Sequence, residues 1–402
     1  MSKKYKLSEK VTVEQGAPAV VAVSRVGEKR WGFHQFPALS RLPDGRIFCM
    51  FSYQPDAVAS YGIPARRFTS SDAGVTWKRA KEEGPIRGAP HSVISEVFDG
   101  EFLCIPPIPA FDLQKAKVAM PEPIGRFRSY MDNLYYRLAD CPKKLRDHFA
   151  ALPAWRWTPK TKAWRPEKVK YDTRDALVVT RAKGRERHLV PTTWLEHPLL
   201  KVGRELHYAD YRANYLLDDG GVPKHRSTVL MVSTDNGRSF QRRATVAYDP
   251  KGKDLMGEPR LALNSRGELV CVIRRTHHVQ KPMAITFSKD RGRTWEKPRK
   301  LHEFGVFPDL ALLDCGVMAL SFGRPGVHLS FSLNGTGRTW TTPIAVRRGG
   351  TGHVMRKTCG YTSILALDAN SFLLAYSDFE HKDAAGKQRK AILVRKVTVH
   401  VK

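Results

Sequence analysis

The chain alternates between short apolar runs and turn residues, and one hairpin pattern occurs six times along it. Each copy consists of an apolar run, a short turn and a second apolar run, as between Glu258 and Arg274. The six turns lie at Asp44–Gly45, Asp99–Gly100, Val202–Gly203, Arg266–Gly267, Cys315–Gly316 and Ala369–Asn370. Short apolar runs bounded by turn residues are typical of β-strands. The pattern therefore predicts an all-β chain made of six repeated units.

The spacing of these turns indicates the size of each unit. Most neighbouring turns are separated by about 50 to 65 residues, which suits a four-stranded sheet with its loops. The interval between Gly100 and Gly203 is roughly twice as long, so we expect an insertion over about 105–190. Within it, 125–150 is expected to be partly helical, from Tyr130, Leu134, Leu138, Leu145 and Phe149. A lid, an oligomer contact and a plain surface excursion remain open as its role.

A second repeat has the pattern Ser-x-Asp-x-Gly-x-(Thr/Ser)-(Trp/Phe). Close copies lie at 70–77, 233–240 and 288–295, and a fourth at 332–340 has one extra residue and Asn in place of Asp. Serine and aspartate side chains satisfy the backbone amides of a turn, and glycine adopts the positive φ that many hairpin turns require. The repeat therefore predicts hairpin turns, in which the aspartates stabilise the turn rather than act as catalysts.

Both ends of the chain have the composition of strands. Residues 19–24 and 391–401 are rich in valine and other apolar residues. Pairing between these segments closes a ring of sheets and removes exposed edges. With 402 residues the chain is long for one domain, but all-β domains often exceed the usual size. We therefore expect a single domain over 1–402.

The register of the hairpins predicts where a binding site lies. Each first strand begins about nine residues before the turn, each second strand ends about seven or eight after it, and antiparallel pairing brings these positions to one face. The first-strand positions hold Phe36, His91, Trp194, Glu258, Phe307 and Tyr361, and the second-strand positions hold Arg274, Arg324, Asp210 and Asp378. Polar side chains from separate sheets then meet near the axis and form a shallow pocket. The Ser-x-Asp turns are expected on the opposite face.

The Ser-x-Asp repeat resembles the Asp-boxes, or BNR repeats, of the sialidase (neuraminidase) superfamily, over about 30–400. The resemblance implies a six-bladed β-propeller. Three central segments are also similar to family motifs. They are Gly257-Glu258-Pro259 followed by Arg274, Gly323-Arg324-Pro325, and Cys359-Gly360-Tyr361-Thr362.

The resemblance implies that Tyr361 is the nucleophile and that Glu258 is the base that takes its proton. Sialidases differ from most glycosidases in using a tyrosine nucleophile, and the physical reason is the carboxylate on the anomeric carbon of sialic acid. This carboxylate repels an attacking carboxylate, whereas a phenol attacks uncharged with a base beside it. Arg274 and Arg324 are then expected to bind the substrate carboxylate through charge-assisted hydrogen bonds.

The sequence departs from the family pattern at two places. Gln35, within 34–39, occupies the position of the first of the family's three arginines, and it brings no charge. The family's acid/base aspartate has Asp56 as its candidate here. His91 and Asp210 complete the expected substrate contacts, since both fall at the central positions.

Structural alternatives exist for each of these residues. In the structural interpretation, Tyr361 is an ordinary aromatic residue of a strand. Glu258 and Arg274 then form an ion pair that only stabilises the fold. In the same interpretation, Arg324 stabilises a turn, and His91 is a structural histidine with its hydrogen bonds satisfied.

Three functions follow from these alternatives. The first is a glycosidase for a terminal acidic sugar, with a sialoside as the leading substrate. The second is a propeller that cleaves a uronic acid or another anionic sugar by hydrolysis or by elimination, the latter needing a base beside the carboxylate. The third is a non-catalytic carbohydrate- or protein-binding propeller, because a fold alone does not determine function.

Charge narrows the choice of partner. The chain carries 68 basic and 39 acidic residues, a formal net charge of +29. Such a surface attracts anions, and generic surface charge, an acidic glycan and a nucleic acid are the three interpretations. Lysine and arginine are spread along the whole chain without a nucleic-acid-binding motif. We therefore expect an acidic carbohydrate partner and no nucleic acid, while the oligomeric state stays open.

Other motifs are missing from the sequence. It has no GxGxxG after a strand, no P-loop, no HExxH and no GxSxG, so we expect no cofactor. No apolar run is long enough to span a membrane, and the first residues lack the apolar core of a signal peptide. These features predict a cytoplasmic protein that does not enter a membrane. Six cysteines without a CxxC pair, mostly in apolar runs, predict buried, reduced thiols.

Overall fold

The computed structural model describes residues 2–57, 60, 63, 65–80, 93–107, 111–128, 132–181, 188–189, 195–275, 280–350 and 353–402. Three of its sheets share one plan, with four antiparallel strands in chain order. Their strands are β3 (Phe33–Arg41), β4 (Ile47–Tyr53), β5 (Arg66–Ser70) and β6 (Lys78–Arg79); β21 (Met256–Leu263), β22 (Leu269–Arg275), β23 (Met283–Ser288) and β24 (Arg299–Leu301); and β25 (Val306–Leu312), β26 (Met318–Gly323), β27 (Val327–Ser332) and β28 (Ile344–Arg347). The prediction of an all-β chain is confirmed.

An eight-stranded sheet consists of two four-stranded halves. The strands of the two halves are joined by a short parallel pairing, Lys170 with Ser239 and Tyr171 with Phe240. One half contains β7 (Ile94–Glu96), β8 (Phe102–Cys104), β12 (Ala151–Thr158) and β13 (Ala163–Tyr171), and the other β16 (Leu200–Val202), β17 (Glu205–Asp210), β19 (Thr228–Ser233) and β20 (Ser239–Ala247). Each half therefore repeats the four-stranded plan.

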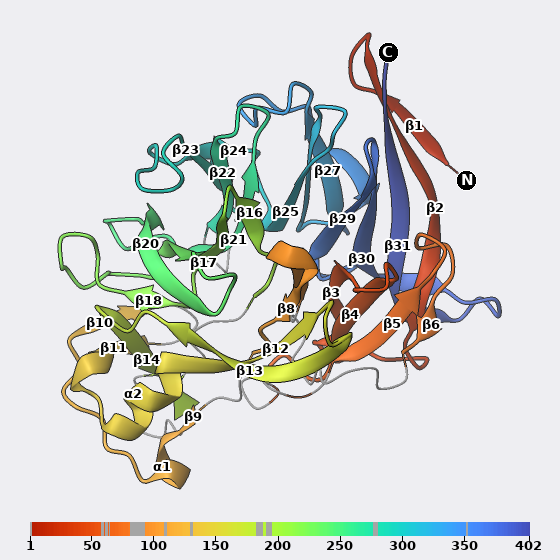
Figure 1. Ribbon diagram of the computed structural model, residues 1–402. Helices are drawn as coiled ribbons and strands as arrows, with labels where there is room; N and C mark the ends of the chain where they lie inside the picture. The colour runs from red at the N-terminus through yellow and green to blue at the C-terminus, as the bar shows by residue number, and fades with distance from the viewer. Residues whose placement is uncertain are drawn as a thin grey trace.

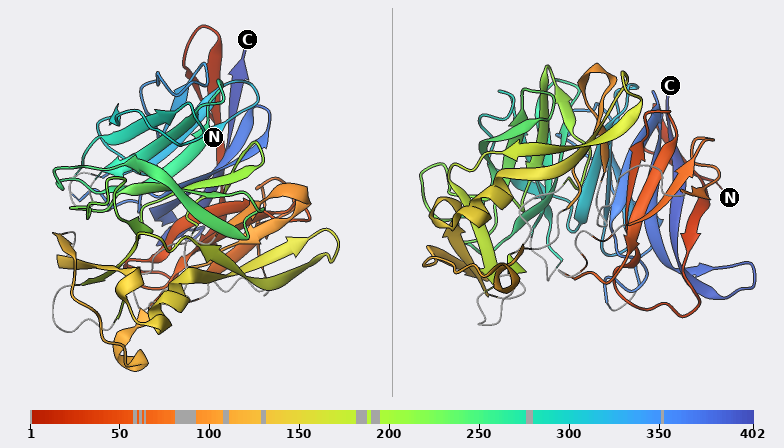
Figure 2. Two further views of the ribbon diagram at one scale, coloured as in Figure 1. Left: turned by 60° about the vertical axis from the view of Figure 1, so that its left-hand side comes forward. Right: turned by 60° about the horizontal axis from the view of Figure 1, so that its bottom comes forward.

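The remaining large sheet joins the two ends of the chain. Its order is β1 (Lys3–Lys6), β2 (Val11–Val23), β31 (Gln388–Val401), β30 (Ser371–Lys382) and β29 (Thr362–Asp368). The β2–β31 pairing runs from Val11–Val401 to Val23–Ala391. The predicted pairing of the chain ends is thus confirmed. Figures 1 and 2 show this sheet and the others arranged around a common centre.

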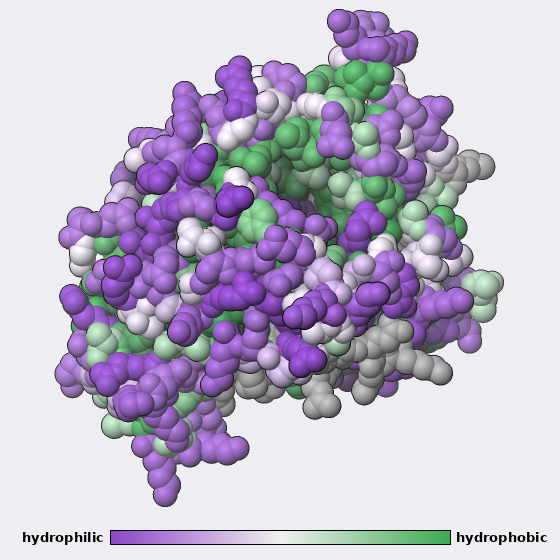
Figure 3. All heavy atoms as spheres, in the orientation of Figure 1, coloured by the Kyte–Doolittle hydropathy of each residue, from purple (hydrophilic) through white to green (hydrophobic). Residues whose placement is uncertain are grey.

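Apolar residues fill the space between successive sheets. Both faces of most strands are buried, so strands such as Val270–Cys271–Val272–Ile273 are continuously apolar. Six core clusters each join two neighbouring sheets or half-sheets, for example Val272 and Ile285 with Leu310 and Leu320. Figure 3 shows a largely hydrophilic surface with a hollow near the centre, where hydrophobic residues are visible. All six cysteines are free thiols, and all but Cys315 are buried.

The innermost strands carry an unusual backbone feature near the centre. Phe36, Glu258 and Phe307 have φ values of 55°, 47° and 44°, each is followed by proline, and each lies at a register shift. Positive φ at residues other than glycine costs roughly 1–3 kcal/mol and is concentrated at functional sites. A bulge also re-aims the side chain that it contains. The three side chains are therefore directed by the same backbone device.

The region predicted as an insertion is divided into parts. Within 105–190, β12 pairs with β8 and β13 pairs with β12, so both strands belong to the main sheet. Outside that sheet lie β9 (Phe111–Asp112), α1 (Leu113–Ala116), β10 (Gly125–Arg128), β11 (Asp132–Arg137), α2 (Lys143–Ala150), β14 (Ala176–Arg181), β15 (His188–Leu189) and β18 (Asn214–Tyr215). The helical expectation for 125–150 holds only for its last part, because β10 and β11 form strands before α2. None of the described helices has the length and apolar character needed to cross a membrane.

The Ser-x-Asp repeats form the predicted turns. In one copy, the Asp290 carboxylate accepts hydrogen bonds from the backbone N–H groups of Arg293 and Thr294, at 3.0 and 2.9 Å, and from the hydroxyls of Ser288 and Thr294. Ser288 lies opposite Leu269, the first residue of β22, whereas Arg274 lies near the end of that strand. The turns are therefore at the end of the sheet away from Arg274, as expected.

Candidate functional site

Glu258 lies in the bulge of β21 and binds groups from three other segments. Its Oε1 accepts hydrogen bonds from Arg274 Nη1, at 2.5 Å, and from the Tyr361 hydroxyl. Its Oε2 accepts a hydrogen bond from the backbone N–H of Phe307, at 3.0 Å. The carboxylate is almost completely buried, and a buried charge is stable only with such partners. The structure thus brings together β21, β22, β25 and the segment before β29.

Tyr361 precedes β29 and is only partly exposed. Its ring stacks on Phe307, with centroids 4.3 Å apart, and meets the edge of Phe36 at 4.9 Å. Burial and the negative charge of Glu258 raise the pKa of Tyr361 well above its usual value, although Arg274 and Arg324 oppose the shift. The phenol is therefore protonated at neutral pH, with a carboxylate already in place to accept its proton.

Arg324 follows β26 and lies beside the ring of Tyr361. Its Nε donates to the backbone carbonyl of Cys359 at 2.7 Å, and its guanidinium lies 5.1 Å from the Tyr361 ring and 5.7 Å from the Trp31 ring. No carboxylate among the described residues forms an ion pair with it. Arg274, in contrast, is paired with Glu258. Of the two arginines, Arg324 is therefore the one whose positive charge is better placed to bind an anionic ligand.

Gln35 is completely buried in β3, one residue before Phe36. Neither its amide oxygen nor its amide nitrogen has a hydrogen-bond partner among the described residues. Leaving a buried polar group unpaired costs about 1–3 kcal/mol, and such groups are uncommon. The amide therefore has hydrogen-bonding capacity that the described part of the chain does not use.

The other predicted site residues lie in different surroundings. Asp56 is exposed, and its carboxylate accepts a hydrogen bond from Trp31 Nε1 at 2.9 Å. Asp210 is buried at the end of β17 and accepts hydrogen bonds from the backbone N–H groups of Arg212 and Ala213, at 2.6 and 3.3 Å. These contacts are those of a turn-forming aspartate. His91 lies outside the described residues.

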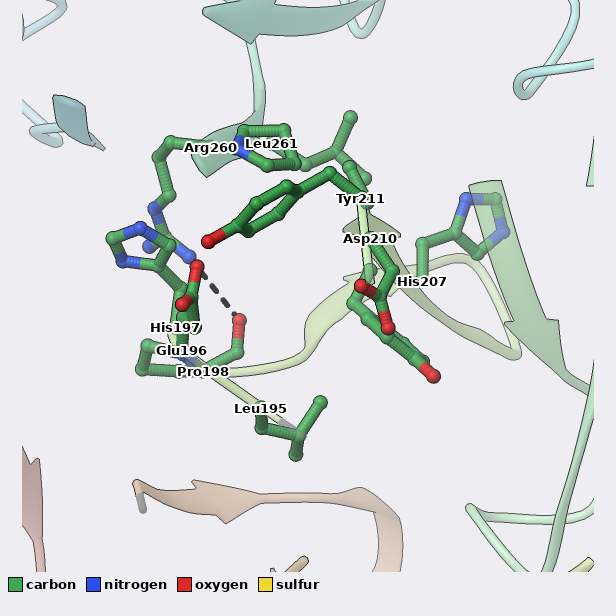
Figure 4. A pocket seen from close by; sticks show the side chains of 12 residues that line it. Leu195, Glu196, His197, Pro198, His207, Asp210, Tyr211, Arg260 and Leu261 are labelled. Atoms are coloured by element: carbon green, nitrogen blue, oxygen red, sulfur yellow. Dashed lines mark hydrogen bonds between the residues drawn. The ribbon is translucent and has the colours of Figure 1, made fainter. Parts of the chain in front are cut away.

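Another carboxyl group, that of Glu196, has a largely buried side chain and was not found from the sequence. Its Oε1 accepts hydrogen bonds from Arg212 Nη2 and Nε, at 2.8 and 3.3 Å. It lines a small cavity between β17 and β21, where Figure 4 shows His197, Tyr211 and Arg260 gathered around it. Burial, and then the charges of Glu258 and Asp210, raise the pKa of Glu196 to about 7 against the opposing effect of Arg212.

Glu196 was missed because its hairpin is shorter than the others. β16 and β17 turn within two residues, since Val202 pairs with Glu205, whereas β21 and β22 first pair at Leu263 and Leu269. Counting nine residues back from Gly203 therefore overshoots to Trp194, which lies outside the described residues. The X-Pro dipeptide marks the matching position, His197, better, and Glu196 directly precedes it. It recurs as Phe36-Pro37, Glu258-Pro259, Phe307-Pro308 and, here, His197-Pro198.

Asp309 connects the strands around the centre. Its carboxylate lies 2.8 Å from Arg260 Nε and 3.7 Å from His197 Nδ1, and it accepts a hydrogen bond from the backbone N–H of Ile364 at 2.6 Å. Burial raises its pKa. Because Ile364 is close to Tyr361 in the chain and Arg260 to Glu258, this buried carboxyl helps to hold both segments in place.

Metal binding finds no support within the described ranges, where no group of three or more His, Cys, Asp or Glu side chains is suitably arranged. The chemistry that these ranges display is that of a carboxylate, a phenol and arginines.

No family model and no curated protein matches the sequence. Solved structures do match. A protein of unknown function from Dyadobacter fermentans is 17% identical, with a TM-score of 0.64 over 97% of this chain and 99% of that one. An alpha-L-arabinanase of Penicillium chrysogenum complexed with arabinobiose is 13% identical, with a TM-score of 0.56 over 94% and 98%. A Hadza microbial sialidase is 13% identical, with a TM-score of 0.51 over 91% and 65%. The chain thus shares the fold of propeller glycosidases.

Proposed function

We propose that this chain is a glycoside hydrolase whose substrate carries a carboxylate, and that it performs exo-α-sialidase-type hydrolysis. The observation that carries the proposal is the hydrogen bond from the Tyr361 hydroxyl to Glu258, with Arg324 unpaired by any described carboxylate beside the phenol ring. A phenol that is held against a base is the arrangement expected of an activated nucleophile.

The architecture that goes with this proposal is one domain over 1–402, a ring of six four-stranded blades. Six core clusters support it, since each joins one sheet or half-sheet to the next and the last returns to the first. In such a ring the innermost strands all approach one axis, so residues from distant parts of the sequence share one pocket.

In the proposed reaction, Tyr361 Oη attacks the anomeric carbon while its proton passes to Glu258. The bond from that carbon to the leaving oxygen breaks, and the leaving oxygen takes up a proton. Water then attacks the same carbon and gives a proton back to the acid that protonated the leaving oxygen. The proton held on Glu258 restores the phenol as the sugar is released. Arg324 binds the substrate carboxylate through its η nitrogens, and Arg274 keeps Glu258 in position.

A second candidate is cleavage of a uronic acid or a similar anionic sugar. This candidate is favoured by Gln35, which stands where the resemblance implies an arginine. The amide of Gln35 is buried and has no hydrogen-bond partner among the described residues. An amide offers hydrogen bonds without charge, which suits a hydroxyl or a more distant carboxylate. Elimination in place of hydrolysis gives an unsaturated product whose ultraviolet absorbance distinguishes the two reactions.

The test is hydrolysis of aryl sialosides, uronides and arabinofuranosides by the wild-type protein and by Tyr361→Phe. We expect turnover of an anionic substrate that falls by roughly 10³-fold or more in this variant, as for the loss of a nucleophile. Tyr5→Phe, on the terminal strand β1, is the matched control and should retain the wild-type rate. Full activity of Tyr361→Phe contradicts the mechanism, and binding without turnover of any substrate indicates a carbohydrate-binding protein instead.

A further inference from the structure

Glu196 directly precedes His197, the residue that matches Glu258 on the neighbouring sheet. Gly257, immediately before Glu258, pairs with Arg274 at the end of the second strand of its sheet. Extending the Leu200–His207 register of β16 and β17 brings His197 opposite Asp210, the end of the equivalent second strand, with Glu196 one residue beyond. The X-Pro dipeptides likewise align His197 with Glu258. Glu196 therefore lies within one residue of the level of Glu258, on the adjacent sheet.

Several charged and titratable groups face Glu196. Arg212 donates two hydrogen bonds to it from the loop after β17, and Asp210 acts on it from the end of that strand. Glu258 acts on it from β21, and Tyr211, whose pKa is raised partly by Glu196, lines the same cavity. His197 and Arg260 also line that cavity. Arg212 stabilises the charged form of Glu196, whereas the carboxylates of Glu258 and Asp210 destabilise it. Burial disfavours the charged form further.

We propose that Glu196 is the proton donor and acceptor for the leaving group of the glycosidase reaction, an inference that rests on the proposed function. When the bond from the anomeric carbon to the leaving oxygen breaks, the Glu196 proton passes to that oxygen. When water attacks the glycosyl–tyrosine bond, Glu196 takes a proton from the water and is restored. The overall change is the addition of one water across one glycosidic bond.

Asp56 is the competing residue for this role. It is exposed, and its carboxylate accepts a hydrogen bond from Trp31. A carboxyl group serves as an acid near neutral pH when its pKa lies close to the working pH, which burial achieves. The pKa of Glu196, about 7, meets this condition.

The experiment compares Glu196→Gln with the wild-type protein on two substrates of the same sugar. One has a nitrophenyl leaving group, which departs without a proton, and the other has an alkyl leaving group, which needs one. We expect roughly a 10²-fold or larger loss of kcat/KM for the alkyl glycoside, and little change in the bond-breaking step for the nitrophenyl glycoside. The alkaline limb of the wild-type pH–rate profile, near pH 7, should disappear in the variant.

Two further variants make the result decisive. Glu205→Gln removes a carboxylate that is also paired with an arginine, Arg243, but at the opposite end of β17, and it should behave as the wild type. Glu196→Asp keeps a carboxyl and should retain part of the alkyl-glycoside activity, which rules out misfolding as the cause. An equal loss on both substrates in Glu196→Gln, or an unchanged alkaline limb, overturns the proposal. So does a leaving-group effect that appears in Asp56→Asn instead.

Failure of this inference is separable from failure of the proposed function. If the wild-type protein cleaves none of the glycosides, the proposed function is wrong, and this role falls with it. If the wild-type protein is active and depends on Tyr361, but Glu196→Gln shows no dependence on the leaving group, only the role of Glu196 is wrong.

Discussion

The two arginines nearest Tyr361 differ in what they already bind. Arg274 is almost fully buried and committed to Glu258, so its charge is largely balanced within the protein. Arg324 uses its Nε on a backbone carbonyl and presents the rest of its guanidinium beside two aromatic rings. Their positions at or just after the ends of second strands were predictable from the hairpin register. Their unequal roles were not, because pairing depends on side-chain contacts between sheets.

We expect Arg324→Met to weaken binding of the acidic sugar about 10- to 100-fold, because a charge-assisted contact to the carboxylate is lost. Calorimetric titration with the free acid and with its methyl ester measures the effect. The ester, which has no charge to pair, should bind the wild-type protein and the variant equally. Equal weakening of both ligands would show that Arg324 only supports the fold.

At the scale of single elements, sequence patterns located strands better than they located side chains. The count of nine residues from the turn reached Phe36, Glu258 and Phe307 because their hairpins have connections of similar length. It failed for the hairpin of β16 and β17, whose two-residue turn shortens the count and hides Glu196. The apolar spacing in 125–150 was likewise ambiguous, since β10, β11 and α2 all contribute buried residues to packed sheets and only α2 is helical.

Asp290→Asn tests the role of the Ser-x-Asp turns. Burial opposes ionisation of Asp290, but hydrogen bonds from Thr294, Ser288 and Arg293 outweigh it and lower the pKa to about 2. A lowered pKa stabilises the fold above the unfolded value near 4, and this contribution is lost as pH falls towards 2. We expect the variant to unfold about 1 kcal/mol more easily at pH 7, with the difference shrinking as the pH falls from about 4 towards 2. Urea unfolding at several pH values measures it, and a difference that is independent of pH contradicts the assignment.

At the scale of the whole molecule, the ring depends on the pairing of its two ends. Strand β2 covers β31 over most of its length and buries Val11, Val13 and Val21. The apolar composition of both segments made this pairing predictable, because neither is stable as an exposed edge. The contacts across the centre were less predictable, since Asp309 joins residues of four sheets that are distant in the sequence.

Deletion of residues 2–24 should destabilise the protein strongly. Burial of a valine side chain contributes about 1.5–3 kcal/mol, so the loss of three approaches the total stability of many domains. Deletion of 2–7, which removes mainly the exposed strand β1, is the control and should have a small effect. Thermal unfolding compares the two. A longer deletion that unfolds at the wild-type temperature would show that β2 does not close the ring.

A covalent bond between the sugar and Tyr361 is the most direct consequence of the proposed chemistry. A sialosyl fluoride with a second fluorine on the ring slows breakdown of the glycosyl–enzyme, so the adduct accumulates and peptide mass spectrometry locates it. We predict one adduct per chain, on the peptide that contains Tyr361, and none in Tyr361→Phe. An adduct on Glu258 or Glu196, or turnover of the substrate by Tyr361→Phe at the wild-type rate, would contradict it.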